Sequence, residues 1–103
     1  VDGIMIHSKL KEPSEILKFA KAFRKNKNYD QIPLICVPST YNQIYDYELR
    51  DAGFNIVIYA NHLMRASYPA MLNAAKSILS NKRSHNIESK ISPVKEIINL
   101  IKQ

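Results

Sequence analysis

The chain has 103 residues, of which 46% are hydrophobic and 23% charged, and its formal net charge is +6. This balance is typical of one globular domain and excludes a disordered chain. No apolar run approaches the roughly 18 residues that span a bilayer, so we expect no membrane partner. Strand-like sequence begins at once without an initiator Met, and we therefore expect Val1 to be a cut or processed end.

The first half of the chain alternates apolar segments with amphipathic ones. Residues 3–7 predict a short strand, and Pro13 between acidic residues opens a helix. The apolar stripe of that helix is Ile16, Leu17, Ala20 and Phe23. Residues 32–37 form a nearly continuous apolar run, which suits a parallel strand covered on both faces.

The second half continues the alternation. A short helix is expected over residues 45–52 with Gly53 as its C-terminal cap, followed by a strand over residues 55–60. A long helix runs to about Asn81, and Pro69 should break or kink it. Its predicted buried face carries Leu63, Ala66, Ala70, Met71, Ala74 and Ile78.

Residues 82–90 read as a polar linker, and Ser92-Pro93 starts a last helix. The apolar stripe of this helix is Val94, Ile97, Ile98 and Ile101. The order β-α-β-α-β-α-α predicts an α/β fold with parallel strands. Three such strands suit either a small doubly wound sheet or a slice of a barrel, and a whole (β/α) barrel needs about 250 residues.

The single cysteine and the basic residues argue against two classes of site. Cys36 lies inside an apolar run and has no second Cys to pair with, so we expect a small buried side chain and a reducing, cytoplasmic location. The basic residues lie on two predicted helices with no aromatic residues between them, which indicates solvated faces and no nucleic-acid partner. They are Lys18, Lys21, Arg24, Lys25, Lys27, Lys95 and Lys102.

Polar residues follow each predicted strand, at the edge where parallel α/β folds collect functional groups. These strand ends are His7-Ser8-Lys9, Ser39-Thr40-Tyr41-Asn42 and Asn61-His62. They contain no Asp or Glu, so the sequence offers no evident site for a hard metal ion. Such residues are equally common in ordinary loops, and spacing alone leaves both interpretations open.

At these strand ends the sequence resembles the phosphoenolpyruvate mutase family of the isocitrate lyase superfamily. The resemblance lies in DGIMIHSK (residues 2–9), VPSTY (37–41), NIVIYANHLMRA (55–66) and ISPVKEI (91–97). It implies about three β/α units from the C-terminal part of a TIM-type (β/α)8 barrel, at residues 1–81. Residues 82–103 would then be a linker and an extra C-terminal helix.

The resemblance also implies a reaction, the interconversion of phosphoenolpyruvate and phosphonopyruvate with formation of a carbon–phosphorus bond. His7 would be the catalytic residue that holds the phosphoryl group, with Ser8, Ser39 and Thr40 in support around the substrate. Mg²⁺ would hold the pyruvyl oxygens in the full-length enzyme, with its ligands outside this chain. Asn61, His62 and Arg65 match a family segment but receive no assigned contact.

Two other readings remain open. Phosphonopyruvate hydrolase, or another lyase of the superfamily, would differ mainly in regions that this sequence lacks. The chain could also be a self-contained α/β interaction module without catalysis. Under the enzyme hypothesis we expect a homo-oligomer in which the apolar stripe of the last helix is buried against another copy or against its own sheet.

Overall fold

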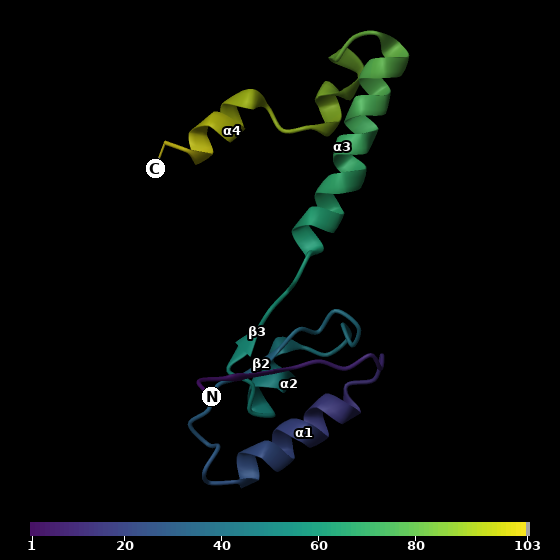
Figure 1. Ribbon diagram of the computed structural model, residues 1–103. Coiled ribbons are helices and arrows are strands. Elements are labelled where there is room, and N and C mark those ends of the chain that lie inside the picture. The colour runs from purple at the N-terminus through teal and green to yellow at the C-terminus, as the bar shows by residue number, and fades with distance from the viewer. Residues whose placement is uncertain (103) are drawn as a thin grey trace. The chain divides into compact units, whose positions relative to one another are not determined.

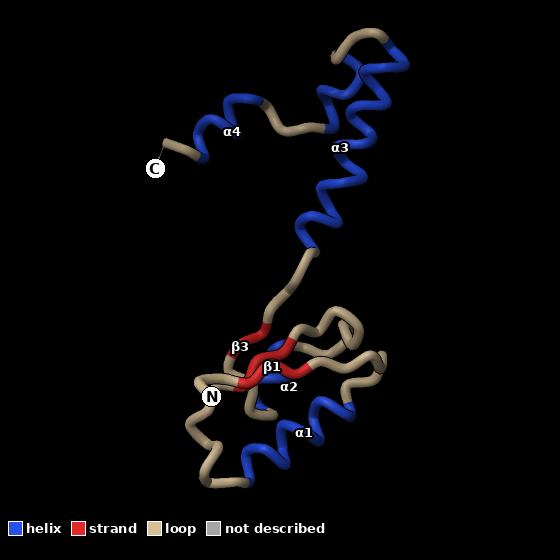
Figure 2. Tube along the Cα trace, in the orientation of Figure 1, coloured by secondary structure: helices blue, strands red, loops and turns tan. Residues whose placement is uncertain are grey.

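The computed structural model describes residues 1–102, which divide into two compact units, Val1–Ala60 and the part from Asn61 onward. The first unit contains β1 (Ile4–Ile6), α1 (Ser14–Lys25), β2 (Leu34–Cys36), α2 (Asp46–Asp51) and β3 (Ile56–Val57). The second contains α3 (His62–Asn81), the 3-10 helix η1 (His85–Lys90) and α4 (Val94–Leu100). Figure 1 labels the four α-helices, β2 and β3, and Figure 2 labels β1 and separates helices from strands by colour. The predicted α/β order with three strands is confirmed.

The three strands of the first unit form one parallel sheet in the order β1-β2-β3. Each strand is shorter than the sequence predicts. Pro33 has no N–H to donate, so β2 starts at Leu34, and the turn at Pro38 ends pairing soon after Cys36. A bond from the Ile58 N–H to the Cys36 carbonyl (2.9 Å) extends the ladder slightly beyond β3.

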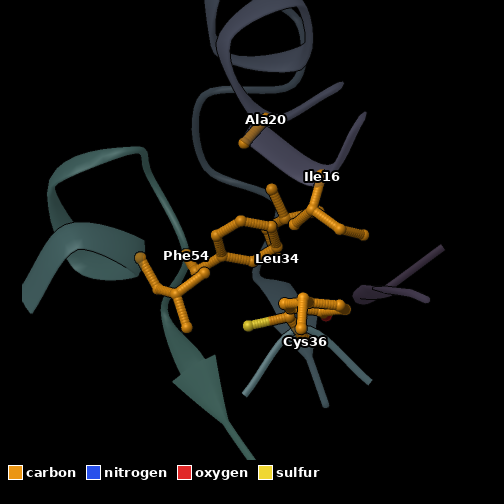
Figure 3. Close-up of a cluster of buried hydrophobic side chains, with 7 residues drawn as sticks. Ile16, Ala20, Leu34, Cys36 and Phe54 are labelled. Carbon is orange, nitrogen blue, oxygen red and sulfur yellow. The ribbon is translucent and has the colours of Figure 1, made fainter. Parts of the chain in front are cut away.

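One face of the sheet carries the core of this unit (Figure 3). Leu34 and Cys36 point to the same face of β2 and are fully buried there. Ile16 and Ala20 of α1 and Leu49 of α2 belong to the same cluster, so both helices cover this face. Tyr41 and Phe54 complete the set of buried core residues. The predicted stripe of α1 and the buried state of Cys36 are confirmed.

The other face of the sheet is uncovered within this unit. Met5, Ile35 and Ile56 are paired across the three strands, and Met5 and Ile56 are 58% and 48% exposed. Ile58 continues the same face at 37% exposure. The prediction that residues 32–37 are covered on both faces is therefore wrong for this unit, because its two helices lie on one side only.

Arg24 ties the amino ends of β2 and β3 to the end of α1. Its guanidinium donates to the backbone carbonyls of Tyr29, Asp30, Ile32 and Gly53 at 2.8–3.2 Å, and to Asn55 Oδ1 at 2.6 Å. We call this arrangement the Arg24 clamp. The prediction of a solvated Arg24 is wrong, since the side chain is half-buried and its hydrogen bonds join three segments.

Gly53 follows α2 as predicted and makes room for this clamp. Its φ of +108° lies in the region that favours glycine, and its N–H bonds the Arg50 carbonyl at 2.9 Å. A Cβ at this position would lie 2.8 Å from Arg24 Cγ. Glycine is thus required here both by its backbone conformation and by the neighbouring arginine.

The second unit buries little of its apolar surface. α3 has no buried residue, and it runs as one helix through Pro69, so the expected break does not occur. The predicted buried face of α3 is largely exposed, with Leu63 87% and Met71 64% accessible. Ile87 is the single buried residue among the described residues of this unit. It lies on η1, which contacts α3.

The sequence predicts a polar linker over residues 82–90, but residues 85–90 form η1, which contacts α3 and buries Ile87. The last helix forms as predicted, at Val94–Leu100. The side chains of its stripe are exposed in this chain: Val94 74%, Ile97 49%, Ile98 48% and Ile101 82%.

Candidate functional site

The carboxyl ends of β1 and β2 lie side by side because the strands are parallel and Ile6 is paired with Cys36. His7 therefore follows β1 next to the point where Val37 follows β2. Exposure alternates along β1, with Met5 and His7 exposed and Ile4 and Ile6 half-buried. This alternation places His7 on the same side of the strand as Met5, at the uncovered face of the sheet.

The His7 imidazole rests near one aromatic ring. The centroids of His7 and Tyr41 are 6.3 Å apart, and the rings are tilted by 42°. This separation lies within the range in which aromatic pairs attract each other. The contact joins the two predicted strand-end segments, His7-Ser8-Lys9 and Ser39-Thr40-Tyr41-Asn42, into one candidate site.

Ser8 lies beside His7 but is turned into the protein. Its side chain is 4% exposed, and its hydroxyl donates to a Glu15 carboxylate oxygen at 2.5 Å. The Ser8 hydroxyl oxygen in turn accepts a hydrogen bond from the Leu10 N–H at 3.1 Å. The Ser8 hydroxyl thus ties the segment after His7 to the first turn of α1.

Ser39 and Thr40 are half-buried in the loop after β2. The Ser39 N–H bonds the Val37 carbonyl at 2.8 Å, which turns the chain sharply at this point. The hydroxyls of both residues lie on the segment that carries Tyr41 back towards His7. Asn61, His62 and Arg65 belong to the second unit, where Asn61 precedes α3 at a φ of +57° and its carbonyl accepts the Arg65 N–H at 2.9 Å.

Tyr41 was not singled out as a site residue by the sequence. It is 1% exposed, and its hydroxyl has no hydrogen-bond partner among the described residues. Burial raises the pKa of this hydroxyl and the Cys36 side chain raises it further, while the Val37 backbone opposes the rise. In the sequence, Tyr41 could have been recognised as a candidate because it is the large aromatic residue in the polar segment after the second strand.

The candidate site is short of groups that could bind a metal ion. Within residues 1–102, no three His, Cys, Asp or Glu side chains lie close enough to share one. Burial raises the pKa of the Cys36 thiol to about 11, so this sulfur is protonated at neutral pH and is a poor ligand and nucleophile. What the site offers is an accessible imidazole at the carboxyl edge of the sheet, a group that can donate a hydrogen bond to an oxyanion.

An open hollow of about 350 Å³ lies elsewhere in the first unit, beside β3. Its walls include the aromatic and aliphatic side chains of Tyr47, Phe54, Val57 and Tyr59. None of the predicted site residues lines it. Along the described part of the chain, no helix is long and apolar enough to cross a membrane.

Comparison with known proteins gives consistent results. The family model for phosphoenolpyruvate phosphomutase matches residues 1–79. A phosphoenolpyruvate phosphomutase from Tetrahymena pyriformis is 42% identical over 96% of this chain and 31% of its own length. A phosphonopyruvate hydrolase from Variovorax sp. is 34% identical over 96% of this chain and 33% of its own length.

Solved structures agree with these relatives. The crystal structure of phosphoenolpyruvate phosphomutase from Streptomyces platensis subsp. rosaceus has a TM-score of 0.83 and 34% identity, covering 97% of this chain and 33% of that one. A phosphonopyruvate hydrolase in complex with oxalate and Mg²⁺ has a TM-score of 0.79 and 34% identity, with 97% and 34% covered. The chain therefore spans about a third of the length of the relatives that it matches.

Proposed function

Because this chain belongs to the phosphoenolpyruvate phosphomutase family, we propose that it is the C-terminal part of an enzyme that interconverts phosphoenolpyruvate and phosphonopyruvate. The observation that carries this proposal is the family match at residues 1–79 together with an exposed imidazole at the carboxyl edge of the sheet. Hydrolysis of phosphonopyruvate is the second candidate, since a hydrolase relative is 34% identical over nearly the whole chain.

In the proposed reaction, His7 donates a hydrogen bond from its imidazole to an oxygen of the phosphoryl group. A fixed donor of this kind stabilises the charge on the group as it moves between oxygen and carbon. Ser39 and Thr40 would support the substrate from the neighbouring loop. Ser8 would support the site indirectly, by holding the backbone next to His7, because its hydroxyl is already bonded to Glu15 and to the Leu10 N–H.

Mg²⁺ is part of the proposal for the full-length enzyme, where it would hold the pyruvyl oxygens and stabilise their negative charge. The residues of this chain do not fit a site for it, because the described part contains no cluster of three suitable side chains. The ligands of the metal ion would therefore lie in a region of the full-length enzyme outside this sequence.

The proposed fold of the whole protein is a (β/α)8 barrel, of which this chain would supply about three units. Two features support it. Both helices of the first unit lie on one face of the sheet, as in a barrel, whereas a doubly wound sheet has helices on both faces. The opposite face is apolar and exposed, and closing a barrel would bury it.

We further propose that the full protein is a cytoplasmic homo-oligomer. The large apolar side chains of α3 and α4 are exposed, and apolar surface of this extent is typical of an interface with another copy. Sedimentation at micromolar concentration tests this part. A compact monomer that buries Val94, Ile97, Ile98 and Ile101 internally would favour the self-contained interaction module.

The test of the proposed activity uses the full-length protein with phosphonopyruvate and Mg²⁺. Phosphoenolpyruvate as the product indicates the mutase, and pyruvate with free phosphate indicates the hydrolase. His7→Ala should lower turnover by about 10²–10⁴-fold with little change in stability. His85→Ala, in η1 of the second unit, is the matched control and should keep the full rate. An unchanged rate in folded His7→Ala would remove the proposed role of His7.

A further inference from the structure

Tyr41 combines two properties that are seldom found together. Its side chain is 1% exposed and belongs to the same cluster as Leu34 and Cys36, so its ring is held firmly by the core. Yet it comes from the loop after β2 and reaches the accessible end of the sheet, where its ring lies 6.3 Å from that of His7. It therefore links a rigid interior to an exposed side chain.

His7 has little else to hold its imidazole. Its side chain is exposed, and no hydrogen bond to it is found among residues 1–102. The backbone is better fixed, because Ser8 anchors the next residue to Glu15 and Leu10. The backbone of His7 is thus fixed, and its imidazole can still move by rotation about the side-chain torsions. The tilted Tyr41 ring restricts this rotation.

We propose that Tyr41 is a positioning residue, whose ring holds the His7 imidazole in the orientation needed to bind a phosphoryl oxygen. This inference rests on the role given to His7 in the proposed function. The ring alone acts in this way, because the Tyr41 hydroxyl is buried without a partner and forms no hydrogen bond with the imidazole. Phenylalanine should therefore replace Tyr41 without loss, whereas leucine should not.

The first test measures the imidazole directly, in the 103-residue chain, by NMR. Contacts between the ring protons of His7 and Tyr41 are expected in the unaltered protein, and their absence overturns the proposal without any variant. Relaxation of the His7 ring should be that of an ordered side chain in the wild type and in Tyr41→Phe. In Tyr41→Leu the order parameter should fall below about 0.6, the range of flexible groups.

Phe54→Leu is the matched control, since it removes another aromatic ring from the same core, where Phe54 is 4% exposed. It should leave the order of His7 unchanged, and the methyl signals of Leu34 report on folding in every variant. If Tyr41→Leu does not fold, Tyr41→Met is measured in its place, because the flexible methionine side chain fills more of the space and still lacks the ring. Equal His7 order in Phe54→Leu and in the folded Tyr41 variant refutes the proposal.

The second test is a double-mutant cycle in the full-length protein. Tyr41→Leu should lower kcat by up to about 10²-fold, the effect of a misplaced catalytic group, with a smaller change in KM. In the His7→Ala background the same substitution should cost nothing further, because the group that it positions is gone. An equal loss in both backgrounds contradicts positioning through His7. If the wild type makes neither product, the proposed activity fails, and the NMR result still decides whether Tyr41 orders His7.

Discussion

The Arg24 clamp allows a quantitative prediction about stability. Arg24→Ala removes every hydrogen bond of the guanidinium, of which those to the Gly53 and Ile32 carbonyls are partly buried, at 2.8–2.9 Å. A hydrogen bond that involves a charged group contributes about 1.5–3 kcal/mol. Taking the lower value for each of these two carbonyls, we expect the free energy of unfolding to fall by about 3 kcal/mol. The exposed bonds to Tyr29, Asp30 and Asn55 add little to this loss, because water can replace them.

Urea unfolding measures this loss. The chain contains no Trp, so the methyl signals of Leu34 and Leu49 in the core of the first unit serve as the probe. With a slope of about 1.5 kcal/mol per M, the midpoint should fall by about 2 M. Arg24→Met keeps the apolar stem of the side chain and should lose nearly as much, because the hydrogen bonds are what it lacks.

Arg50→Ala is the control for the loss of an arginine. Arg50 forms an ion pair with its neighbour Asp51 at 3.1 Å, and the two side chains are 73% and 67% exposed. Such a pair contributes at most about 1 kcal/mol, so the midpoint should fall by no more than about 0.7 M. If Arg24→Met unfolds at the same urea concentration as the wild type, the clamp does not stabilise the unit and the reasoning is wrong.

Three further predictions concern other residues of the first unit and the chain as a whole. Ser8→Ala should lower the free energy of unfolding by about 1–2 kcal/mol, since it leaves the Leu10 N–H and the Glu15 carboxylate without their partner; urea unfolding with no loss would contradict this. Burial raises the pKa of the Cys36 thiol from 9.0 to about 11, so the folded state keeps a proton that the unfolded state releases. Stability should therefore fall as the pH rises through this window, and Cys36→Ala should show a weaker fall in midpoint between pH 8 and pH 10, whereas equal slopes would refute the assignment. Finally, the 103-residue chain with Mg²⁺ and phosphonopyruvate should form no phosphoenolpyruvate above background, because residues 1–102 bring no three candidate metal ligands together. Turnover at an ordinary enzyme rate would overturn the proposal that the chain is only part of the enzyme.

Local patterns predicted the elements whose cause is local. The apolar stripe of α1 follows from helical periodicity, and Gly53 ends α2 because few other residues accept a φ of +108°. The strand lengths could not be predicted as well, because they depend on what the neighbouring strand offers. The run at residues 55–60 looks like a full strand, but its partner β2 ends at Cys36, so only Ile56–Val57 pairs as β3.

The site shows the same division between local and long-range causes. The position of His7 at a strand end could be predicted, because strand direction and alternation decide it. The contact between His7 and Tyr41 could not, since it joins the segments that follow two different strands. Nor could the bond between Ser8 and Glu15, which depends on how α1 packs under the sheet. The role of Arg24 could not be predicted either, because most of its acceptors are backbone carbonyls, which no residue type in the sequence reveals.

The geometry at Gly53 limits how this part of the protein can change during evolution. Two independent obstacles meet there: the positive φ, and the Arg24 side chain 2.8 Å from where a Cβ would stand. Loss of Arg24 removes the second obstacle and leaves the first, so it does not open position 53 to other residues. Replacement of Gly53 disturbs the clamp even when the new residue is one, such as Asn, that tolerates a positive φ. A lineage could therefore change Arg24 and keep Gly53, whereas the opposite order passes through a strained intermediate.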